Sequence, residues 1–235
     1  MRLRVRYAKR GRLRFTSHRD FSRAFERAVF RARIPMAYSS GFNPHPRISY
    51  AGAAPTGSAS EAEYLEIALR EVADAGAVHA ALDEALPDGL DILEVVPSSG
   101  GSLSDRLEVS RWELQLDGVV PEEAESGVRQ LLDTEQVIVE RMTKKGLRSF
   151  DARAAIESMS VSRGPETGRS CAILTVVLRH GVPSVRPDDV LAALREISGV
   201  GSSAAVLQRR LEQGPWQAQD GTVGDPLSPD RDAAE

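Results

Sequence analysis

Four arginines follow one another at intervals of four residues near the start of the chain. They are Arg19, Arg23, Arg27 and Arg31. In a helix they would stack along one ridge, where each like-charged pair costs about 0.2–0.5 kcal/mol. Asp20 and Glu26 supply the acidic charge of this segment. We interpret the series as a surface that binds an anion, and an inert solvated face is the alternative.

A second group of arginines alternates with apolar residues. Arg2, Arg4 and Arg6 are interleaved with Leu3, Val5 and Tyr7. A period of two is typical of a half-buried strand, with one set of side chains on each face. The sequence therefore predicts a strand whose open face carries three arginines. These would extend the anion-binding surface if strand and helix lie side by side.

Residues 38–50 have neither helical nor strand periodicity across their centre. Asn43 and His45 each precede a proline, which biases their backbones toward extended conformations and presets nearby side chains. Aromatic rings beside a cation are the combination that binds single-stranded RNA. The residues of this candidate RNA-binding loop are Tyr38, Gly41, Phe42, Asn43, Pro44, His45, Pro46 and Arg47. The alternative is that the prolines shape a turn and Phe42 covers the core.

Two histidines stand in these basic segments. His18 falls in the first turn of the expected helix, where the helix dipole favours a bound anion, and His45 falls in the loop. Two imidazoles beside a phosphodiester could cleave RNA by general acid–base catalysis without a metal. A metal-independent RNA-processing enzyme that uses His18 and His45 is therefore the alternative to a non-catalytic protein. Structural histidines that only form hydrogen bonds are commoner.

A third basic segment leaves an expected strand in the second half of the chain. Its charged residues are Lys144, Lys145, Arg148 and Arg153. They could extend a basic groove, although Lys-Lys-Gly is also typical of an ordinary hairpin tip. The sequence contains no Gly-rich phosphate loop, no nucleophile elbow and no metal-ligand spacing. We therefore expect no cofactor and no metal.

The elements that position these residues follow the order strand, helix, two strands, helix, strand over residues 1–97. This order is typical of the ferredoxin-like fold. The first helix is expected at about residues 17–33, with Ser17 and Asp20 as a capping box and Pro35 blocking its continuation.

Residues 98–104, rich in Ser and Gly, predict a flexible linker. The order of elements repeats less clearly over residues 105–212. The sequence thus predicts an α+β protein with two tandem ferredoxin-like (βαββαβ) domains and antiparallel sheets. Periodicity stops after residue 212, and residues 213–235 are expected to form a disordered tail.

Charge is segregated along the 235 residues, although the net charge is only −4. Residues 1–50 hold 13 lysines and arginines against two acids, whereas residues 51–140 hold four against 20. Salt screens exposed charges beyond about 8 Å. The basic segment can therefore act on its own.

Cys171 is the one cysteine of the sequence, so the chain alone forms no internal disulfide and no cysteine-based cluster. The sequence has no apolar run long enough to cross a bilayer, and Met1 leads into no apolar signal segment. We therefore expect a cytoplasmic protein without membrane contact.

The N-terminal motifs together resemble the radical SAM-associated (radical SAM-linked) protein family, a bacterial domain of unknown function. The resemblance rests on Phe15-Thr16-Ser17-His18-Arg19-Asp20, on Ile34-Pro35-Met36-Ala37-Tyr38-Ser39, and on Gly41-Phe42-Asn43-Pro44-His45-Pro46. It extends more loosely to Thr143-Lys144-Lys145-Gly146 and Asp151-Ala152-Arg153, and covers roughly residues 1–210.

The resemblance implies which proteins this chain works with, and it implies no activity of its own. Such domains occur fused behind, or encoded beside, a radical SAM protein that often carries a cobalamin-binding region. It implies that His18, Arg19 and the loop residues from Gly41 to Pro46 form the working surface. A radical SAM cluster needs three cysteines, so the radical chemistry would belong to a separate partner. The resulting hypothesis is a non-catalytic accessory protein that engages the substrate of such an enzyme, with RNA expected as substrate and a protein as runner-up.

Overall fold

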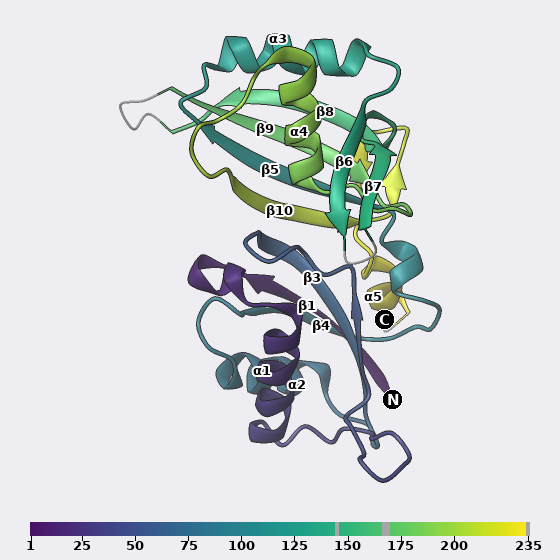
Figure 1. Ribbon diagram of the computed structural model, residues 1–235. Helices are drawn as coiled ribbons and strands as arrows, with labels where there is room; N and C mark the ends of the chain where they lie inside the picture. The colour runs from purple at the N-terminus through teal and green to yellow at the C-terminus, as the bar shows by residue number, and fades with distance from the viewer. Residues whose placement is uncertain (144–145, 166–169, 234–235) are drawn as a thin grey trace. The chain divides into compact units, whose positions relative to one another are not determined.

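The chain folds into two units, and neither is one continuous stretch of sequence (Figure 1). The computed structural model describes residues 1–143, 146–165 and 170–233. The first unit takes in residues 1–107, 213–215 and 224–233, and the second takes in residues 108–212 and 216–223. Helices and antiparallel strand pairs build both units, which confirms the predicted α+β class.

The first unit contains one sheet with two long helices. Its elements are β1 (Arg2–Lys9), the 3-10 helix η1 (Gly11–Phe15), α1 (His18–Arg31), β2 (Ile48–Ala51), β3 (Ala59–Ala68), α2 (Ala75–Ala85), β4 (Ile92–Pro97), the 3-10 helix η2 (Ser104–Arg106) and α5 (Ser228–Asp232). The strands lie in the order β4-β1-β3-β2. β1 pairs antiparallel with both β3 and β4 and is therefore a central strand.

Other elements cover both faces of β1. Leu3, Val5 and Tyr7 are buried in a core beneath α1 and α2. The two helices contribute the buried side chains Phe21, Phe25, Val78 and Leu82 to this core. The opposite face of β1 carries Arg4, whose guanidinium contacts Asp230 of α5. Strand alternation is as predicted, but the arginine side of the strand is covered as well.

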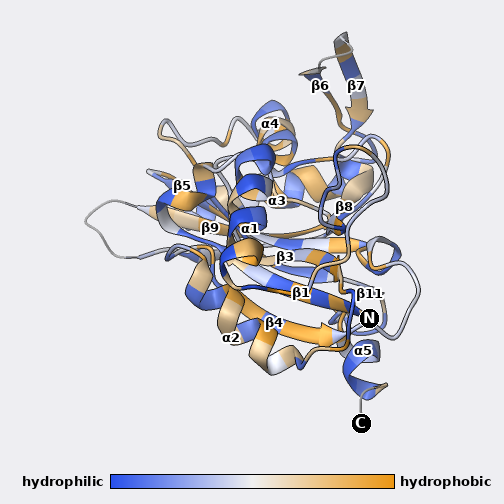
Figure 2. Ribbon diagram, turned by 90° about the horizontal axis from the view of Figure 1, so that it is seen from below, coloured by the Kyte–Doolittle hydropathy of each residue, from blue (hydrophilic) through white to orange (hydrophobic). Residues whose placement is uncertain are grey.

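α1 begins at His18 because Ser17 caps it. Ser17 Oγ accepts a hydrogen bond from the amide of Asp20 at 3.2 Å, and its hydroxyl donates to the Asp20 carboxylate at 2.6 Å. The helix ends at Arg31, and Arg33 follows with φ of 54°. Figure 2 shows α1 mostly in the hydrophilic colour and β4 in the hydrophobic one. No helix in the described part of the chain is long and apolar enough to cross a membrane.

The second unit contains a sheet, two helices and a separate hairpin. Its elements are β5 (Val109–Asp117), α3 (Pro121–Asp133), β6 (Ile138–Thr143), β7 (Gly146–Asp151), the 3-10 helix η3 (Arg153–Ala155), β8 (Ile156–Arg163), β9 (Cys171–Arg179), α4 (Pro187–Ser198), β10 (Leu207–Gly214), β11 (Trp216–Gln217) and β12 (Thr222–Val223). The last two residues of β10 belong to the first unit. The main strands lie in the order β10-β5-β9-β8, while β6 pairs with β7 and β11 with β12. Arg141 of the hairpin forms an ion pair with Asp189 at the start of α4.

The prediction of a flexible linker at residues 98–104 is wrong. These residues belong to the first unit. The amide and hydroxyl of Ser99 both donate hydrogen bonds to Asp230, and the carbonyls of Gly100 and Gly101 each accept one from Arg4 at 2.8 Å. Ser and Gly serve here to bring backbone groups against a buried ion pair.

The prediction of a disordered tail at residues 213–235 is also wrong for its described part, which extends to residue 233. This part contains the end of β10, then β11, β12 and α5. Its polar composition hides two fully buried anchors, the apolar side chain of Leu227 and the carboxylate of Asp230. These two anchors hold residues 224–233 on the first unit.

Candidate anion-binding surface

The four spaced arginines all lie on the exposed side of α1, opposite the buried residues of that helix. We call this set, Arg19, Arg23, Arg27 and Arg31, the arginine ridge. Within the described residues, none of the four guanidinium groups forms an ion pair or hydrogen bond with a carboxylate. Two other exposed arginines of the first unit do: Arg2 pairs with Glu66 at 3.1 Å, and Arg10 pairs with Glu61 and Asp91. The ridge is thus a row of positive charge whose guanidinium groups form no ion pair within the described chain.

A groove of about 990 Å³ lies between α1 and the end of α2. Three residues of the ridge, Arg23, Arg27 and Arg31, line it. Its apolar part comes from Ala24, Ala28, Phe30, Ala85, Leu86 and Pro87, and its acidic part from Glu26 and Glu84. Phe30 leaves 83% of its surface exposed. The groove therefore combines cations with an open aromatic face.

A second hollow, of about 570 Å³, lies at the C-terminal end of α1. Phe30 and Arg31 line it from the helix, and Tyr38 lines it from the predicted RNA-binding loop. Arg33 and Arg70 add two further cations. Ridge and loop, predicted separately from the sequence, therefore meet at this hollow.

The loop is closed at its base and open at its tip. The Ser39 amide donates to the His45 carbonyl at 2.9 Å, and the His45 amide donates to Ser39 Oγ at 3.0 Å. Tyr38 and Pro46 form an isolated bridge. At the tip, Gly41 has φ of 129° and Phe42 is fully exposed. Phe42 does not cover the core, contrary to the alternative interpretation of this segment.

The remaining loop residues differ in how they are used. Asn43 and Pro44 are exposed at the tip. The backbone of Arg47 joins the loop to its surroundings, because its amide donates to Ala37 and its carbonyl accepts from Ala68. Arg47 itself is an exposed residue. The loop thus presents ring and cation side chains from a hydrogen-bonded frame.

The two histidines of the catalytic alternative lie in different elements: His18 is the first residue of α1, and His45 lies in the loop. The His18 ring meets the Tyr50 ring edge to face, with centroids 4.9 Å apart, and burial raises the pKa of the Tyr50 phenol. His45 is exposed in the loop. The described side chains include no hydrogen bond or ring contact between His18 and His45.

The prediction of an open, arginine-bearing strand face is wrong for β1. Arg4 is fully buried, and its guanidinium is occupied by Asp230, Glu66 and two backbone carbonyls. Arg6 is half-buried and donates to the Glu61 carbonyl at 2.9 Å. Arg2 is exposed but pairs with Glu66. None of the three is a cation without a partner, because neighbouring strands and α5 supply acceptors.

The basic residues predicted in the second unit also differ from one another in their surroundings. Lys144 and Lys145 lie outside the described residues. Arg148 is exposed on β7, opposite Arg141 in the hairpin register. Arg153 is half-buried and donates to the carbonyls of Leu132 and Ile156, both at 3.2 Å. Arg153 therefore connects the end of α3 to the start of β8, and its predicted role in anion binding stays a prediction.

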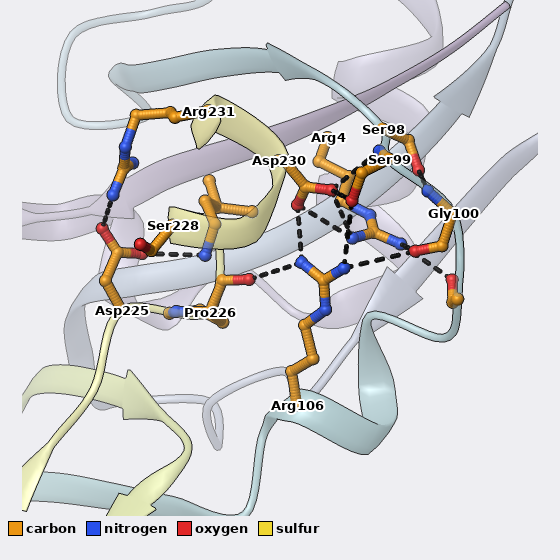
Figure 3. Close-up of polar contacts among 12 residues, drawn as sticks. Arg4, Ser98, Ser99, Gly100, Arg106, Asp225, Pro226, Ser228, Asp230 and Arg231 are labelled. Carbon is orange, nitrogen blue, oxygen red and sulfur yellow. Dashed lines mark hydrogen bonds and ion pairs between the residues drawn. The ribbon is translucent and has the colours of Figure 1, made fainter. Parts of the chain in front are cut away.

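One charged cluster escaped sequence analysis altogether (Figure 3). Both carboxylate oxygens of Asp230 lie 2.8 Å from Arg4 Nη1, and Arg106 Nη1 lies 2.7 Å from Asp230 Oδ2. Arg4 and Asp230 are 226 residues apart in the chain, so no local pattern could pair them. The available hint was Leu227, an apolar residue three positions before an acid in an otherwise polar segment.

The described residues contain no group of three or more histidine, cysteine, aspartate or glutamate side chains able to hold a metal ion. Cys171 is buried, and burial raises the pKa of its thiol. A neutral buried thiol is a poor nucleophile.

The first half of the chain and most of the second match one family model, described as an uncharacterized protein conserved in bacteria (DUF2344), over residues 2–187. The chain belongs to this family. No curated protein matches it.

Among solved structures, a chain from the crystal structure of a Cbf5–Nop10–Gar1 complex is similar in fold, with a TM-score of 0.50 and 10% sequence identity. The likeness covers 90% of the present chain and 48% of that chain. At this identity it concerns the fold alone.

The DUF2344 match contains the arginine ridge, the loop and both arginines that bind Asp230. It ends before residues 224–233, which include Leu227 and Asp230. The buried ion pair therefore joins a residue inside the matched region to one outside it.

Proposed function

We propose that this DUF2344 protein is a non-catalytic accessory protein that binds RNA and presents it to a separate radical SAM enzyme. The observation that carries the RNA part is the arginine ridge, because its four guanidinium groups have no carboxylate partner within the described chain. Arranging like charges on one helix is unfavourable unless an anion offsets them.

The length of the ridge favours a polyanion over a small anion. A helix rises 1.5 Å per residue, so arginines four residues apart are spaced by about 6 Å along the axis, and Arg19 and Arg31 by about 18 Å. A single phosphate or carboxylate would reach two of these groups at most. A nucleic acid backbone, with a regular row of phosphates, can engage all four.

The aromatic residues near the ridge favour single-stranded RNA. Phe30 and Tyr38 line the same hollow as Arg31, and Phe42 is exposed at the loop tip. Bases that stack on such rings contribute about 1–3 kcal/mol each, without demanding one sequence. Unpaired bases have faces free for this contact, whereas bases inside a duplex do not.

The partner part of the proposal rests on the resemblance to radical SAM-associated domains. The cluster chemistry of such an enzyme requires three cysteines, and this sequence has one. The radical SAM protein, with or without a cobalamin-binding region, would therefore supply the catalysis, in the cytoplasm. The present chain would supply substrate binding.

We also interpret each unit as ferredoxin-like. The orders β4-β1-β3-β2 and β10-β5-β9-β8 both follow from a strand-helix-strand-strand-helix-strand sequence when the β6–β7 hairpin is treated as an insertion. On this interpretation α1 and α2 lie together on one side of the first sheet, which places the ridge beside the groove.

Binding of a labelled single-stranded RNA at several salt concentrations tests the RNA part. The logarithm of the binding constant should fall with the logarithm of salt by about 0.7 per phosphate neutralised, or about 3 if all four arginines contribute. The variant Arg23→Glu/Arg27→Glu should lose binding while keeping its circular dichroism spectrum. Arg163→Glu is the matched control, since Arg163 is exposed and paired with Glu122.

An RNA-binding constant that changes neither with salt nor with the ridge substitutions would rule the proposal out. The catalytic alternative is separated by His18→Ala/His45→Ala, which would abolish RNA cleavage by a nuclease. The partner part is tested in the native bacterium: a radical SAM protein should co-purify, and its RNA modification should disappear when this chain is deleted. An unchanged modification pattern would refute the accessory role.

A further inference from the structure

The carboxylate of Asp230 occupies a built anion site on the first unit (Figure 3). Arg4 Nη1 lies 2.8 Å from each of its oxygens, Arg106 Nη1 lies 2.7 Å from one, and the Ser99 amide and hydroxyl donate at 2.9 and 2.7 Å. The side chains of Arg4 and Asp230 are both fully buried. Charged donors arranged in this way around a carboxylate form the strongest class of protein hydrogen bond.

An apolar contact accompanies the charged one. Leu227, three residues before Asp230, is fully buried. It belongs to a cluster made by Ala51, Ala62, Tyr64, Val96, Leu103 and Leu107. Leu227 is the N-cap residue of the short helix α5, and the Asp230 amide donates to its carbonyl, so this turn brings both buried side chains to the first unit. One apolar and one acidic side chain thus dock together.

The receptor and the segment that fills it are separate parts of the chain. Arg4, Ser99 and Arg106 all precede residue 108, whereas residues 224–233, here called the C-terminal segment, return to the first unit after residues 216–223 of the second. Arg4 is also held by Glu66 at 3.3 Å and by the carbonyls of Gly100 and Gly101. Its guanidinium is therefore positioned by groups other than Asp230.

We propose that this receptor is a peptide-binding site, that the C-terminal segment is its intramolecular ligand, and that an acidic segment of a partner protein competes for it. The competing segment would carry an apolar residue followed three positions later by a carboxylate. Recognition of acidic motifs by arginine clusters, and of short helices by apolar grooves, are both common modes of peptide binding. This inference is independent of the RNA-binding proposal.

A peptide fits this receptor better than RNA does. Leu227 enters an apolar cluster in which a phosphate or ribose has no favourable contact. Ser99 and the two arginines match the two oxygens of one carboxylate. The present occupant has this chemistry, and the receptor should accept the same chemistry from another chain.

The test uses the full chain and a labelled peptide corresponding to residues 224–233. The attached segment has an effective concentration in the mM range, so micromolar peptide should bind the unmodified protein weakly. The variant Asp230→Asn should release the attached segment and bind the peptide at least about tenfold more tightly. A peptide carrying Asp232→Asn should bind as well as the parent, because Asp232 is exposed, whereas a peptide carrying Asp230→Asn should not bind.

A second variant protects the test against misfolding of the first. Leu227→Ala keeps every charge of the cluster and removes the apolar anchor, so it too should free the receptor for the peptide. Adding Arg106→Ala to either variant should abolish peptide binding. Equal peptide binding by unmodified and variant proteins, no binding by either variant, or displacement of the segment by RNA but not by the peptide would overturn the proposal.

Discussion

Asp230 keeps its charge although its side chain is fully buried. Burial alone would raise the pKa of this carboxyl, but hydrogen bonds from Ser99 and the charge of Arg4 outweigh burial, and the pKa lies below its ordinary value. Asp230 stabilises Arg4 in turn, since a buried guanidinium without a carboxylate is costly. Each of the two charges makes the burial of the other tolerable.

Replacing Asp230 by Asn should destabilise the first unit. Removing one partner of a buried ion pair costs about 3–5 kcal/mol, and the lower end applies here because Arg4 keeps Glu66 and two carbonyls. Hydrogen exchange of β1 and β3 would report the loss. Asp232→Asn, at an exposed position of the same helix, should change the free energy of unfolding by less than about 0.5 kcal/mol.

The contribution of Asp230 should depend on pH in one direction. Because its pKa is lowered in the folded protein, the contribution is complete above the ordinary aspartate pKa of about 3.9 and is lost as the pH falls through the lower folded value. The stability difference between the unmodified protein and Asp230→Asn should therefore be constant from pH 5 to 7, approximately. It should shrink below about pH 4. A difference that grew on acidification would contradict the lowered pKa.

Two arginines of the second unit should respond differently to substitution. Arg153 donates to two carbonyls, so Arg153→Ala should cost about 1–3 kcal/mol of stability. Arg148 is exposed, and Arg148→Ala should leave stability within about 0.5 kcal/mol. Urea unfolding of the two variants compares them directly, and equal losses would argue against the structural role of Arg153.

Among the elements, α1 combines the ridge with an aromatic side chain that contributes little to the core. Phe30 is 83% exposed, so Phe30→Ala should leave thermal stability nearly unchanged. The free energy of RNA binding should become less favourable by about 1–3 kcal/mol if one base stacks on the ring. Phe25→Ala is the contrasting variant: Phe25 is fully buried, and its loss should cost about 3–5 kcal/mol of stability. Unchanged RNA affinity in Phe30→Ala would contradict the stacking of a base on Phe30.

α1 could be predicted because its signals are local. Its apolar spacing, the Ser17 cap and Pro35 all lie within one short segment. β8 was not predicted: a bulge between Ile156 and Ser158 shifts the register at its start, and after it only Met159 and Val161 alternate with polar residues. The period of two that identifies a strand is lost where an extra residue shifts the register.

The arginine face of β1 shows the second limit of local patterns. Alternation correctly separates Leu3, Val5 and Tyr7 from the arginines. It cannot tell that β1 is central in its sheet or that Asp230 returns to cover Arg4. Whether a side chain of a strand is exposed depends on which distant segments pack against that face of the sheet. The sequence of the strand itself does not contain this information.

At the scale of the whole molecule, the first unit is assembled from both ends of the described chain. Its C-terminal segment should therefore exchange backbone hydrogens slowly. The amides of Asp230 and Arg231 donate to the Leu227 carbonyl, and the Leu227 amide donates to Asp225. Hydrogen exchange measured by mass spectrometry should show residues 225–232 protected at neutral pH and the loop tip near Phe42 unprotected. Equal, rapid exchange in both segments would contradict the docking of α5.

The distance along the chain between Arg4 and Asp230 matters while the protein is being made. A ribosome adds about 5–20 residues per second, so the 226 residues that separate the two take roughly 11 to 45 s to synthesise. During that time Arg4 has emerged and its main carboxylate does not yet exist. Most of the second unit, residues 108–212, is synthesised in that interval. The first unit thus lacks its buried ion pair until residue 230 is made, and a nascent chain that stops earlier leaves Arg4 of the central strand with Glu66 as its carboxylate partner.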